Sequence, residues 1–531
     1  MPPSMVGIQS TFSIEQERVI MVLKQGSRIA VIGAGISGIA AAHVLKKNGF
    51  IPIVFEKHQR VGGVWATAYP EIHLQNIYNQ YRLSDFDWSF QPDLHPTGEQ
   101  VMRYLTEAVE HHQLDIRLNH EVLETRESTD GWLVRYENQD GIQEEHFDFL
   151  LLAAGQYTDG KNLPQFLDQE QFQGRILTER DITSLDLFNG KRVVIVGYGK
   201  SALDMATLAA ERSAQVNHVF RTPSWLIPEW ILGAHFTYAL FTRFGNVMMT
   251  SWAQPTTMER FLHNKLPFII SGFWDFIQSI VLFQLKRAGK AKDQAAQERL
   301  KTLIPEHKIL MDFRSSGALG PENYYPLVAE GKILPYHSEI ECFSPDAVRL
   351  QSGMVIPCDV VVLSTGYLTP TFPFLPDRYR VRLEAETDGP QLYRHLLHPR
   401  IPRLAFAGFN HGYMHVPSAE IGTQWLCAYL RGELELPTLE EMERSIEHVR
   451  AWKRQNIKFE NARSCAVSTR FQQYIDILLK ELEISPYRKL PNPLAELFSR
   501  YQASDYKGVY EEYERAKSKR TAPLKTLPLD T

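Results

Sequence analysis

Cysteine is scarce in this sequence, and its spacing excludes two common uses. The 531 residues contain Cys342, Cys358, Cys427 and Cys465, and no two of them form a C-x-x-C pair. So few and so scattered thiols indicate a reducing compartment rather than a disulfide framework. We therefore expect a cytoplasmic protein.

A basic excess, a secretion signal and a metal-ligand spacing are also missing. The net charge of −5 excludes the electrostatic footprint of a nucleic-acid-binding protein. The start of the chain lacks a basic stretch followed by an unbroken apolar core, so we predict no signal peptide. The histidines show no ligand spacing, and no metal site is predicted. These histidines are His43, His58, His73, His95, His111 and His112.

Long unbroken apolar runs are absent as well. The most apolar stretch, residues 266–285, is interrupted by Pro267 and Asp275. This disfavours a membrane span and favours a buried or interfacial helix. Peripheral membrane contact is the alternative.

Two segments share one pattern: a buried strand, a glycine-rich turn, a helix and a second strand. They are "SRIAVIGAGISGIAAAHVLKKNGFIPIVFEK", residues 27–57, and "KRVVIVGYGKSALDMATLAAERSAQVNHVFR", residues 191–221. Short β-branched runs such as 29–32 and 51–55 are typical of buried parallel strands. Two such units predict an α/β fold with two Rossmann-like dinucleotide-binding domains.

Two further apolar strands end in glycine, at 147–157 and 358–367, one on each side of the second unit. The simplest arrangement inserts the second domain into the first. The predicted boundaries are 26–188 for the first part of the first domain, 189–334 for the second domain, 335–505 for the rest of the first domain with C-terminal helices, and 506–531 for a tail.

Three other segments have a recognisable character. Residues 229–312 are rich in aromatic residues and helix formers, and we expect them to cover the active site. Pro437 and Thr438 open a predicted helix. The charged tail after residue 505 is expected to be loosely ordered.

The first glycine-rich turn has the spacing G-x-G-x-x-G at Gly33, Gly35 and Gly38. The first glycine permits a tight turn, the second lets a pyrophosphate approach the backbone, and the third lets helix and strand pack closely. Glu56 follows at the end of the next strand, where its carboxylate can accept hydrogen bonds from ribose hydroxyls. This combination predicts a bound dinucleotide.

The segment "RVGGVW", residues 60–65, follows directly. Gly62 and Gly63 would let a second loop approach the same ligand, and Trp65 could wall an aromatic ring system. This placement resembles flavin sites, so we assign FAD to the first domain, with Gly63 and Trp65 in contact.

The second turn ends in Ala202 where the first has glycine, which the fingerprint allows. Its second strand ends in Arg221 rather than an acid, and an arginine there can pair with the 2′-phosphate of NADPH. A structural role for Arg221 is the alternative. The residues expected to contact NADPH are Gly197, Gly199, Lys200, Ser201 and Arg221.

The chain resembles the flavin-containing monooxygenases, which have separate FAD and NADPH domains, and most of all their plant-type N-hydroxylating members. The resemblance runs from about residue 28 to 505. The matching stretches are "LQNIYNQYRLSDFDW" (74–88), "GKRVVIVGYGKSALD" (190–204), "RTPSWLIPEW" (221–230), "HPRIPRLAFAGF" (398–409) and "SAEIGTQWLCAYLRG" (418–432).

The resemblance implies a mechanism. NADPH reduces the flavin, O2 adds to form a C4a-(hydro)peroxide, and oxygen passes to a soft nucleophile, the nitrogen of an amine or a thioether sulfur. Baeyer–Villiger oxygenation of a ketone and uncoupled NADPH oxidation are the alternatives. Residues 311–326 lack the Lys-Arg pair of related oxygenases, which disfavours ketone oxygenation. The oligomeric state is left open, with a homodimer as one alternative.

The resemblance also singles out two positions. Family members have an asparagine near the flavin; counting back from Ser84 gives Gln75, whereas residue type favours Asn76. In the linker pattern F-x-G-x-x-x-H, Thr178 replaces the histidine, and we expect it to affect NADPH docking or coupling while FAD binding stays intact.

The substrate pocket is less defined. Six aromatic residues of the insert could form a hydrophobic pocket or lid, or could only pack its helices together. They are Trp230, Phe236, Tyr238, Phe241, Phe273 and Trp274.

Overall fold

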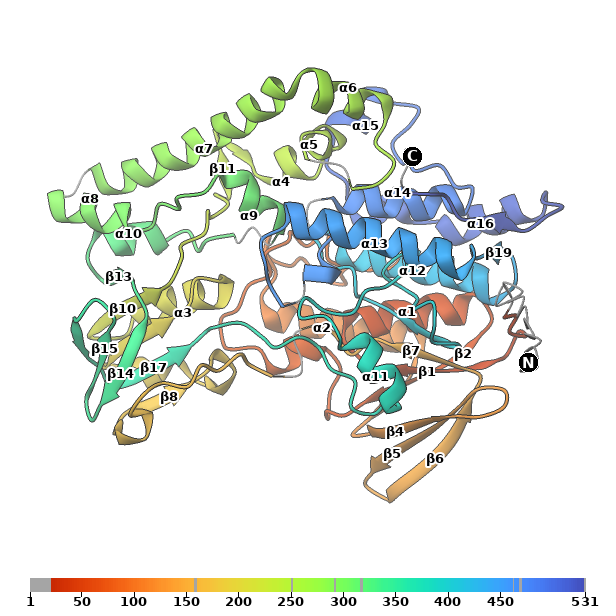
Figure 1. The fold of residues 1–531 in the computed structure, drawn as a ribbon, viewed down its shortest axis with the longest axis horizontal. Helices are drawn as coiled ribbons and strands as arrows, with labels where there is room; N and C mark the ends of the chain where they lie inside the picture. The colour runs from red at the N-terminus through yellow and green to blue at the C-terminus, as the bar shows by residue number, and fades with distance from the viewer. Residues whose placement is uncertain are drawn as a thin grey trace, which may run out of the picture.

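The computed structural model describes residues 21–156, 160–249, 252–290, 293–315, 319–461, 463–467 and 470–529. Two five-stranded sheets, parallel throughout, form its two centres (Figure 1). The first has the order β18 (Leu404–Phe406), β7 (Phe149–Leu152), β1 (Arg28–Ile32), β2 (Ile51–Glu56) and β3 (Asp115–Leu118). The second has the order β13 (Ile333–His337), β10 (Gln215–Phe220), β9 (Arg192–Val196), β17 (Val360–Leu363) and β8 (Arg175–Leu177).

The two sheets are built alike. Helix α1 (Ile36–Lys47) follows β1 and α3 (Lys200–Ala210) follows β9, each after a glycine turn. In each sheet a strand that is followed by a glycine, β7 before Gly155 or β17 before Gly366, pairs directly with the strand before that turn. The prediction of two Rossmann-like dinucleotide-binding domains is confirmed.

The predicted boundaries at 188 and 335 are wrong for the second sheet. It includes β8, which ends at residue 177, and β17, which begins at residue 360. The chain leaves the first sheet after β7 and returns to it at β18. The sequence could not assign β17, because a buried apolar parallel strand has the same composition in either sheet.

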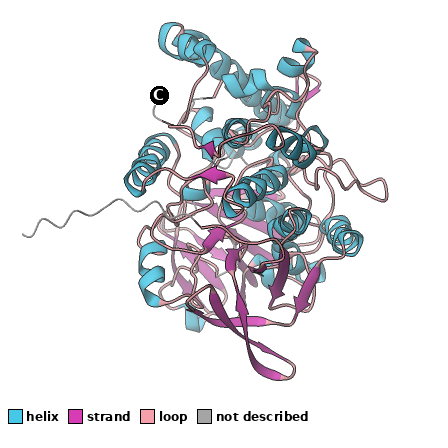
Figure 2. Ribbon diagram, turned by 90° about the vertical axis from the view of Figure 1, so that its right-hand side faces the viewer, coloured by secondary structure: helices cyan, strands magenta, loops and turns pink. Residues whose placement is uncertain are grey.

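Helices and small antiparallel sheets surround these centres, with most strands below the long helices in Figure 2. Helix α12 (His415–Leu430) packs on α1 and α14 (Phe471–Glu481), and its residues from Val416 onward are buried. Helix α2 (Gly98–His112) packs on α1, α11 (Asp377–Leu383) packs on the opposite face of the first sheet, and α15 (Pro493–Phe498) contacts the helical insert. The small sheets are β4 (Glu121–Glu127), β5 (Trp132–Asn138) and β6 (Gly141–Phe147), and β14 (Ile340–Ser344), β15 (Ala347–Leu350) and β16 (Val355–Pro357).

The predicted helical insert projects from the second domain. It consists of the hairpin β11 (Trp230–Ile231) and β12 (Ala234–His235), then α4 (Thr237–Leu240), α5 (Arg243–Val247), α6 (Thr257–Lys265), α7 (Pro267–Lys290), α8 (Gln294–Lys301) and α9 (Ile309–Ser315). Helix α10 (Tyr324–Ala329) follows it and packs on α3 and β13 of the second domain. Helix α7 runs along the top of Figure 1. Its segment Pro267–Ala288 is long and apolar enough to cross a membrane by length and composition alone, and a third of its most apolar window is buried.

The C-terminal region differs from expectation in one respect. Helix α13 (Leu439–Asn456) begins after Thr438, as predicted, with Glu441 completing a capping box. The prediction of a loosely ordered tail is wrong, because α16 (Val509–Lys517) and β20 (Leu524–Lys525) are formed, and β20 pairs with β19 (Leu434–Glu435). Buried Tyr513 anchors this tail by donating to the Glu433 carboxylate at 2.7 Å.

Candidate active site

One continuous cavity of about 1750 Å³ joins the two sheets at the carboxyl ends of their central strands. Ligands of open parallel sheets bind at this edge. All of the predicted site residues line the cavity except Gly38 and Thr178. Those that line it are Gly33, Gly35, Glu56, Gly63, Trp65, Gln75, Asn76, Gly197, Gly199, Lys200, Ser201 and Arg221.

The glycines of the first turn have two different roles: two are required by the packing of the protein itself, and one leaves room for a ligand. Gly33 has φ +107°, and a Cβ there would lie 2.6 Å from the carbonyl oxygen of Ala153. A Cβ on Gly38 would overlap the carbonyl oxygen of Gly33, so this position requires glycine for the protein's own packing. By contrast, a Cβ on Gly35 would meet only Gly63 Cα, at 3.7 Å. The backbones at Gly35 and Gly63 therefore form a narrow cradle that a side chain would fill.

Two side chains complete the first half of the cavity. Glu56 is buried, and its carboxylate accepts from the backbone N–H groups of Ala34 at 2.9 Å and His58 at 3.0 Å. This holds the glycine turn in place and leaves acceptor lone pairs for a ribose. Trp65 donates to the Tyr81 hydroxyl at 2.8 Å, and both rings line the cavity.

The second glycine turn repeats this geometry. Gly197 has φ +121°, and a Cβ there would overlap the carbonyl oxygen of Ser364. No atom lies within 4 Å of the position for a Cβ on Gly199, which precedes α3. His218 Nε2 donates to the Gly197 carbonyl at 2.6 Å, while Nδ1 accepts from the Tyr324 hydroxyl at 2.7 Å. Burial lowers the pKa of His218 to about 4, so the ring is neutral.

Charged residues surround this second turn. Arg221 is exposed at the end of β10, and Ser201 is half-buried in α3; both line the cavity. Lys200 forms an ion pair with Asp204, which also accepts from the Tyr69 hydroxyl at 2.6 Å. Burial and the Asp204 charge hold the pKa of Tyr69 well above its usual range. Sequence reasoning missed Asp204 and Tyr69; only the i,i+4 spacing of Lys200 and Asp204 signalled the ion pair.

The two amide candidates both reach the cavity. Asn76 is buried and its Nδ2 donates to the Tyr413 carbonyl, whereas Gln75 Oε1 accepts from the Leu319 backbone N–H at 2.9 Å. The structure therefore brings both side chains to the cavity wall.

Thr178 has a local role in the linker. Its backbone N–H and its hydroxyl donate to Asp181 at 2.7 and 2.8 Å. Among the described residues, the next two, Glu179 and Arg180, line the cavity, but Thr178 does not. Buried Glu179 forms an ion pair with Lys161 and accepts from the Tyr367 hydroxyl at 3.2 Å. The linker motif therefore indicated Thr178, whereas the next residue, Glu179, is the one that faces the cavity.

The six aromatic residues of the insert do not form this cavity. Phe236, Phe241 and Trp274 are buried in the main core, and Trp230 and Tyr238 are about half exposed. Of the described residues that line the cavity, none is among the six. The pocket or lid interpretation is therefore wrong for this cavity, and the packing alternative holds for the buried members.

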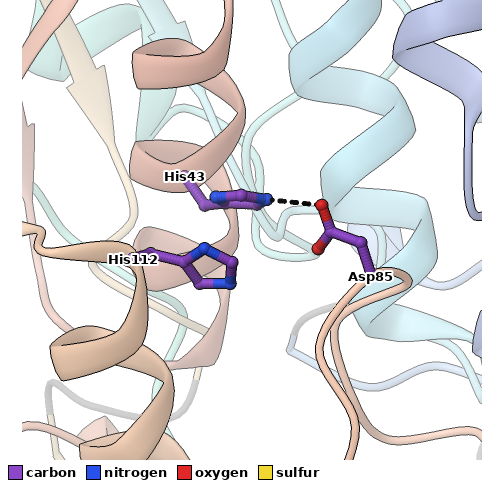
Figure 3. A group of neighbouring side chains, drawn as sticks. All are labelled: His43, Asp85 and His112. Carbon is purple, nitrogen blue, oxygen red and sulfur yellow. Dashed lines mark hydrogen bonds and ion pairs between the residues drawn. The ribbon is translucent and has the colours of Figure 1, made fainter.

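Other histidines complete the wall or gather elsewhere. His411 and His415 line the cavity, and burial lowers the pKa of each to about 4. The fold also assembles two groups that linear spacing did not indicate. One is His43, Asp85 and His112 (Figure 3), and the other is His95, Glu229 and His235.

Two dinucleotide-binding sheets that open onto a shared cavity define a two-cofactor oxidoreductase. The chain matches the FMO-like family, described as flavin-binding monooxygenase-like, over residues 26–268 and 331–491. It belongs to this family.

Relatives and solved structures agree with this assignment. The chain is 29% identical over 535 residues to probable flavin-containing monooxygenase 1 of Arabidopsis thaliana, covering 92% of this chain and 97% of that protein. S-allyl-L-cysteine S-oxygenase from Allium sativum superposes with a TM-score of 0.60 at 17% identity, covering 94% and 100% of the two chains. The OTEMO complex with FAD and NADP gives a TM-score of 0.57 at 19% identity, covering 81% and 86%. The protein is a flavin-dependent monooxygenase that uses FAD and NADPH.

Proposed function

We propose that the protein oxygenates the nitrogen of an amine or, as the close alternative, the sulfur of a thioether. The observation that carries this proposal is a group of uncharged side chains in the cavity wall. Gln75, Asn76, His411 and His415 lie there, and both histidines are neutral at physiological pH. Such a wall favours a neutral, electrophilic oxygen donor, which electron-rich nitrogen and sulfur attack.

The chain's own residues have separate tasks in this scheme. The turn at Gly33–Gly38 and Glu56 would hold FAD, and the turn at Gly197–Ala202 with Arg221 would hold NADPH. Bound FAD supplies hydride acceptance and O2 activation. The amides of Gln75 and Asn76 offer both donors and acceptors beside the reacting groups.

Ketone oxygenation is the main competing function. In related enzymes that reaction uses an arginine near the flavin, which keeps the oxygen donor anionic. Arg180 and Arg221 line the cavity, but both belong to the second-domain side, where Arg180 stacks 4.8 Å from the Tyr367 ring. Their position supports a role in NADPH binding rather than in ketone chemistry.

Anaerobic reduction followed by product analysis tests the proposal. We expect a yellow protein that NADPH bleaches without oxygen, and oxygenated product from an amine or a thioether once air is admitted. The ratio of product to NADPH measures coupling, with peroxide assayed alongside. A lactone or ester formed from a ketone, with no product from either soft nucleophile, contradicts the proposal. Stoichiometric peroxide with every substrate indicates an uncoupled oxidase instead.

We also propose peripheral membrane contact through α7. Phe268, Phe276 and Phe283 of this helix are each more than half exposed, an arrangement typical of interfacial helices. Co-sedimentation with anionic lipid vesicles should fall when Phe276 and Phe283 are both changed to Ser. Leu167→Ser, an equally exposed apolar site outside the insert, is the control and should leave sedimentation unchanged. Equal sedimentation of all three proteins would refute the contact.

A further inference from the structure

A ligand set lies where the helical insert meets the first domain. His95 Nε2 and His235 Nε2 face each other at 3.4 Å, and Glu229 Oε1 lies 3.9 Å from His235 Nε2. From these atoms we propose that His95, His235 and Glu229 bind a divalent transition-metal cation, for which Zn²⁺ is the suited ion. Two imidazoles and a carboxylate are a donor set that such ions prefer.

The separation of the two nitrogens fits a metal better than a hydrogen bond. Zn–N bonds of about 2.05 Å at tetrahedral angles place two nitrogens about 3.4 Å apart. Hydrogen bonds of nitrogen donors are usually about 2.7–3.2 Å. Glu229 is half-buried, and its carboxylate needs to approach by only about half an ångström to reach the same tetrahedral edge. Water would occupy the fourth position.

Each imidazole is oriented through its other nitrogen. His95 Nδ1 contacts the carbonyl oxygens of Leu74 at 3.1 Å and Asn76 at 3.2 Å. His235 Nδ1 lies 2.8 Å from the Thr237 hydroxyl. Metal-binding histidines usually donate their second N–H to such oxygens, which directs Nε2 at the ion.

The local fold explains how Glu229 and His235 come together. The hairpin β11–β12 turns at Leu232 and Gly233, both with positive φ, and pairs Trp230 with His235. The Phe236 N–H donates to the Glu229 carbonyl at 2.9 Å, closing the open end of the hairpin. Glu229 therefore directly precedes the last pair of the hairpin, His235 belongs to that pair, and His95 approaches both from the first domain.

Surrounding charges act in both directions. Burial lowers the pKa of both imidazoles, and repulsion from Arg500 at His235 and from Lys200 at His95 adds to this effect. Burial raises the pKa of Glu229, and the nearby charge of Glu322 adds to this effect. The two positive charges oppose a bound cation, whereas Glu322 favours one.

The group drawn in Figure 3 is a weaker candidate on the same criteria. The rings of His43 and His112 pack against each other with centroids 3.7 Å apart and an interplanar angle of 36°, so ring packing accounts for their proximity. The Asp85 oxygen that contacts His43 at 3.1 Å also lies 3.4 Å from the Lys47 ammonium. This group is therefore a suitable control.

The proposed ion would tie the insert to the active-site wall. His95 is bonded to the carbonyl of Asn76, whose side chain lines the cavity, while Glu229 and His235 belong to the insert. A metal bridge would therefore restrain the segment that carries both amide candidates.

Calorimetric titration of the FAD-loaded, full-length protein with Zn²⁺, after EDTA treatment and desalting, tests the proposal. We expect one saturable site, weakened more than tenfold in His95→Gln and in His235→Gln, and weakened less in Glu229→Gln. Glutamine retains hydrogen-bonding capacity at both histidine positions, which limits damage to the fold. His43→Gln and His112→Gln are matched controls and should bind as the wild type does.

A thermal readout separates binding from misfolding. Zn²⁺ should raise the unfolding midpoint of the wild type and of both control variants, but not of His95→Gln or His235→Gln. FAD absorbance verifies that each variant is folded. The proposal is overturned if the wild type shows no saturable site, if both ligand variants bind with unchanged affinity, or if binding is lost in the control variants instead.

Discussion

We expect Gly199 to be required for NADPH binding but not for folding or for FAD binding. No atom lies within 4 Å of the Cβ position on this residue, and its φ of −80° suits any amino acid. The substitution Gly199→Ala therefore meets no steric obstacle within the protein. Its only internal cost is a poorer helix N-cap, on the order of 1 kcal/mol or less. The protein should remain folded and yellow.

The cost appears when NADPH binds. The second glycine of the fingerprint lets the pyrophosphate approach the backbone, so a methyl group there occupies ligand space. Overpacking a close contact costs about 1–3 kcal/mol. At about 1.4 kcal/mol per tenfold change, NADPH should bind roughly 5- to 150-fold more weakly.

Anaerobic flavin reduction at increasing NADPH concentration measures this effect. The half-saturating concentration should rise in Gly199→Ala, while the ratio of FAD to protein stays at the wild-type value. Gly35→Ala is the corresponding variant in the first turn, because Gly35 occupies the place there that Gly199 occupies in the second. This variant should lose FAD instead. Gly272→Ala, a glycine in α7 with equally open surroundings, should change neither quantity. Unchanged NADPH affinity in Gly199→Ala would refute the assignment of the second turn.

Three further outcomes follow from individual contacts. Glu56→Gln places an amide N–H₂ against one of the two backbone N–H donors. The free energy of unfolding should therefore fall by about 1–3 kcal/mol, measured by urea denaturation, and the FAD content should fall as well. His218 has a folded pKa of about 4, below its unfolded value, so its contribution to stability is complete above about pH 6.5 and is lost as pH falls. At pH 5 the loss is about 2 kcal/mol, and His218→Gln should show a correspondingly smaller difference between urea melts at pH 7 and pH 5. Thr178→His should alter NADPH affinity or coupling but not FAD content; if it alters neither, the linker position is neutral in this protein.

The local units of the fold could be predicted from sequence because their signals are local. The glycine turns, their flanking strands and the Thr438 cap each depend on a few neighbouring residues. The assignment of β17 could not be predicted, because strand pairing is decided by contacts distant in sequence. The prediction of a loosely ordered tail was wrong for a related reason. Its charged composition indicates disorder, but partners such as Glu433 fix Tyr513 and Lys517 from elsewhere in the chain.

The candidate site shows the same division. Residues belonging to a contiguous motif, such as Gly35 and Arg221, could be assigned to the cavity from sequence. Tyr69 and His415 could not, because no motif links them to the turns they accompany. Thr178 illustrates a finer limit: the linker motif identifies the right segment, but the direction of each side chain depends on the turn that Asp181 caps.

The two glycine turns differ at their third position. At Gly38 a Cβ would overlap the Gly33 carbonyl, so the first turn permits glycine alone and packs helix against strand tightly. The equivalent Ala202 in the second turn carries a Cβ, which lies 3.5 Å from the Cβ position on Gly197. The second turn therefore accommodates a methyl group where the first accommodates only a hydrogen atom, and the dinucleotide-binding fingerprint allows either residue at this position.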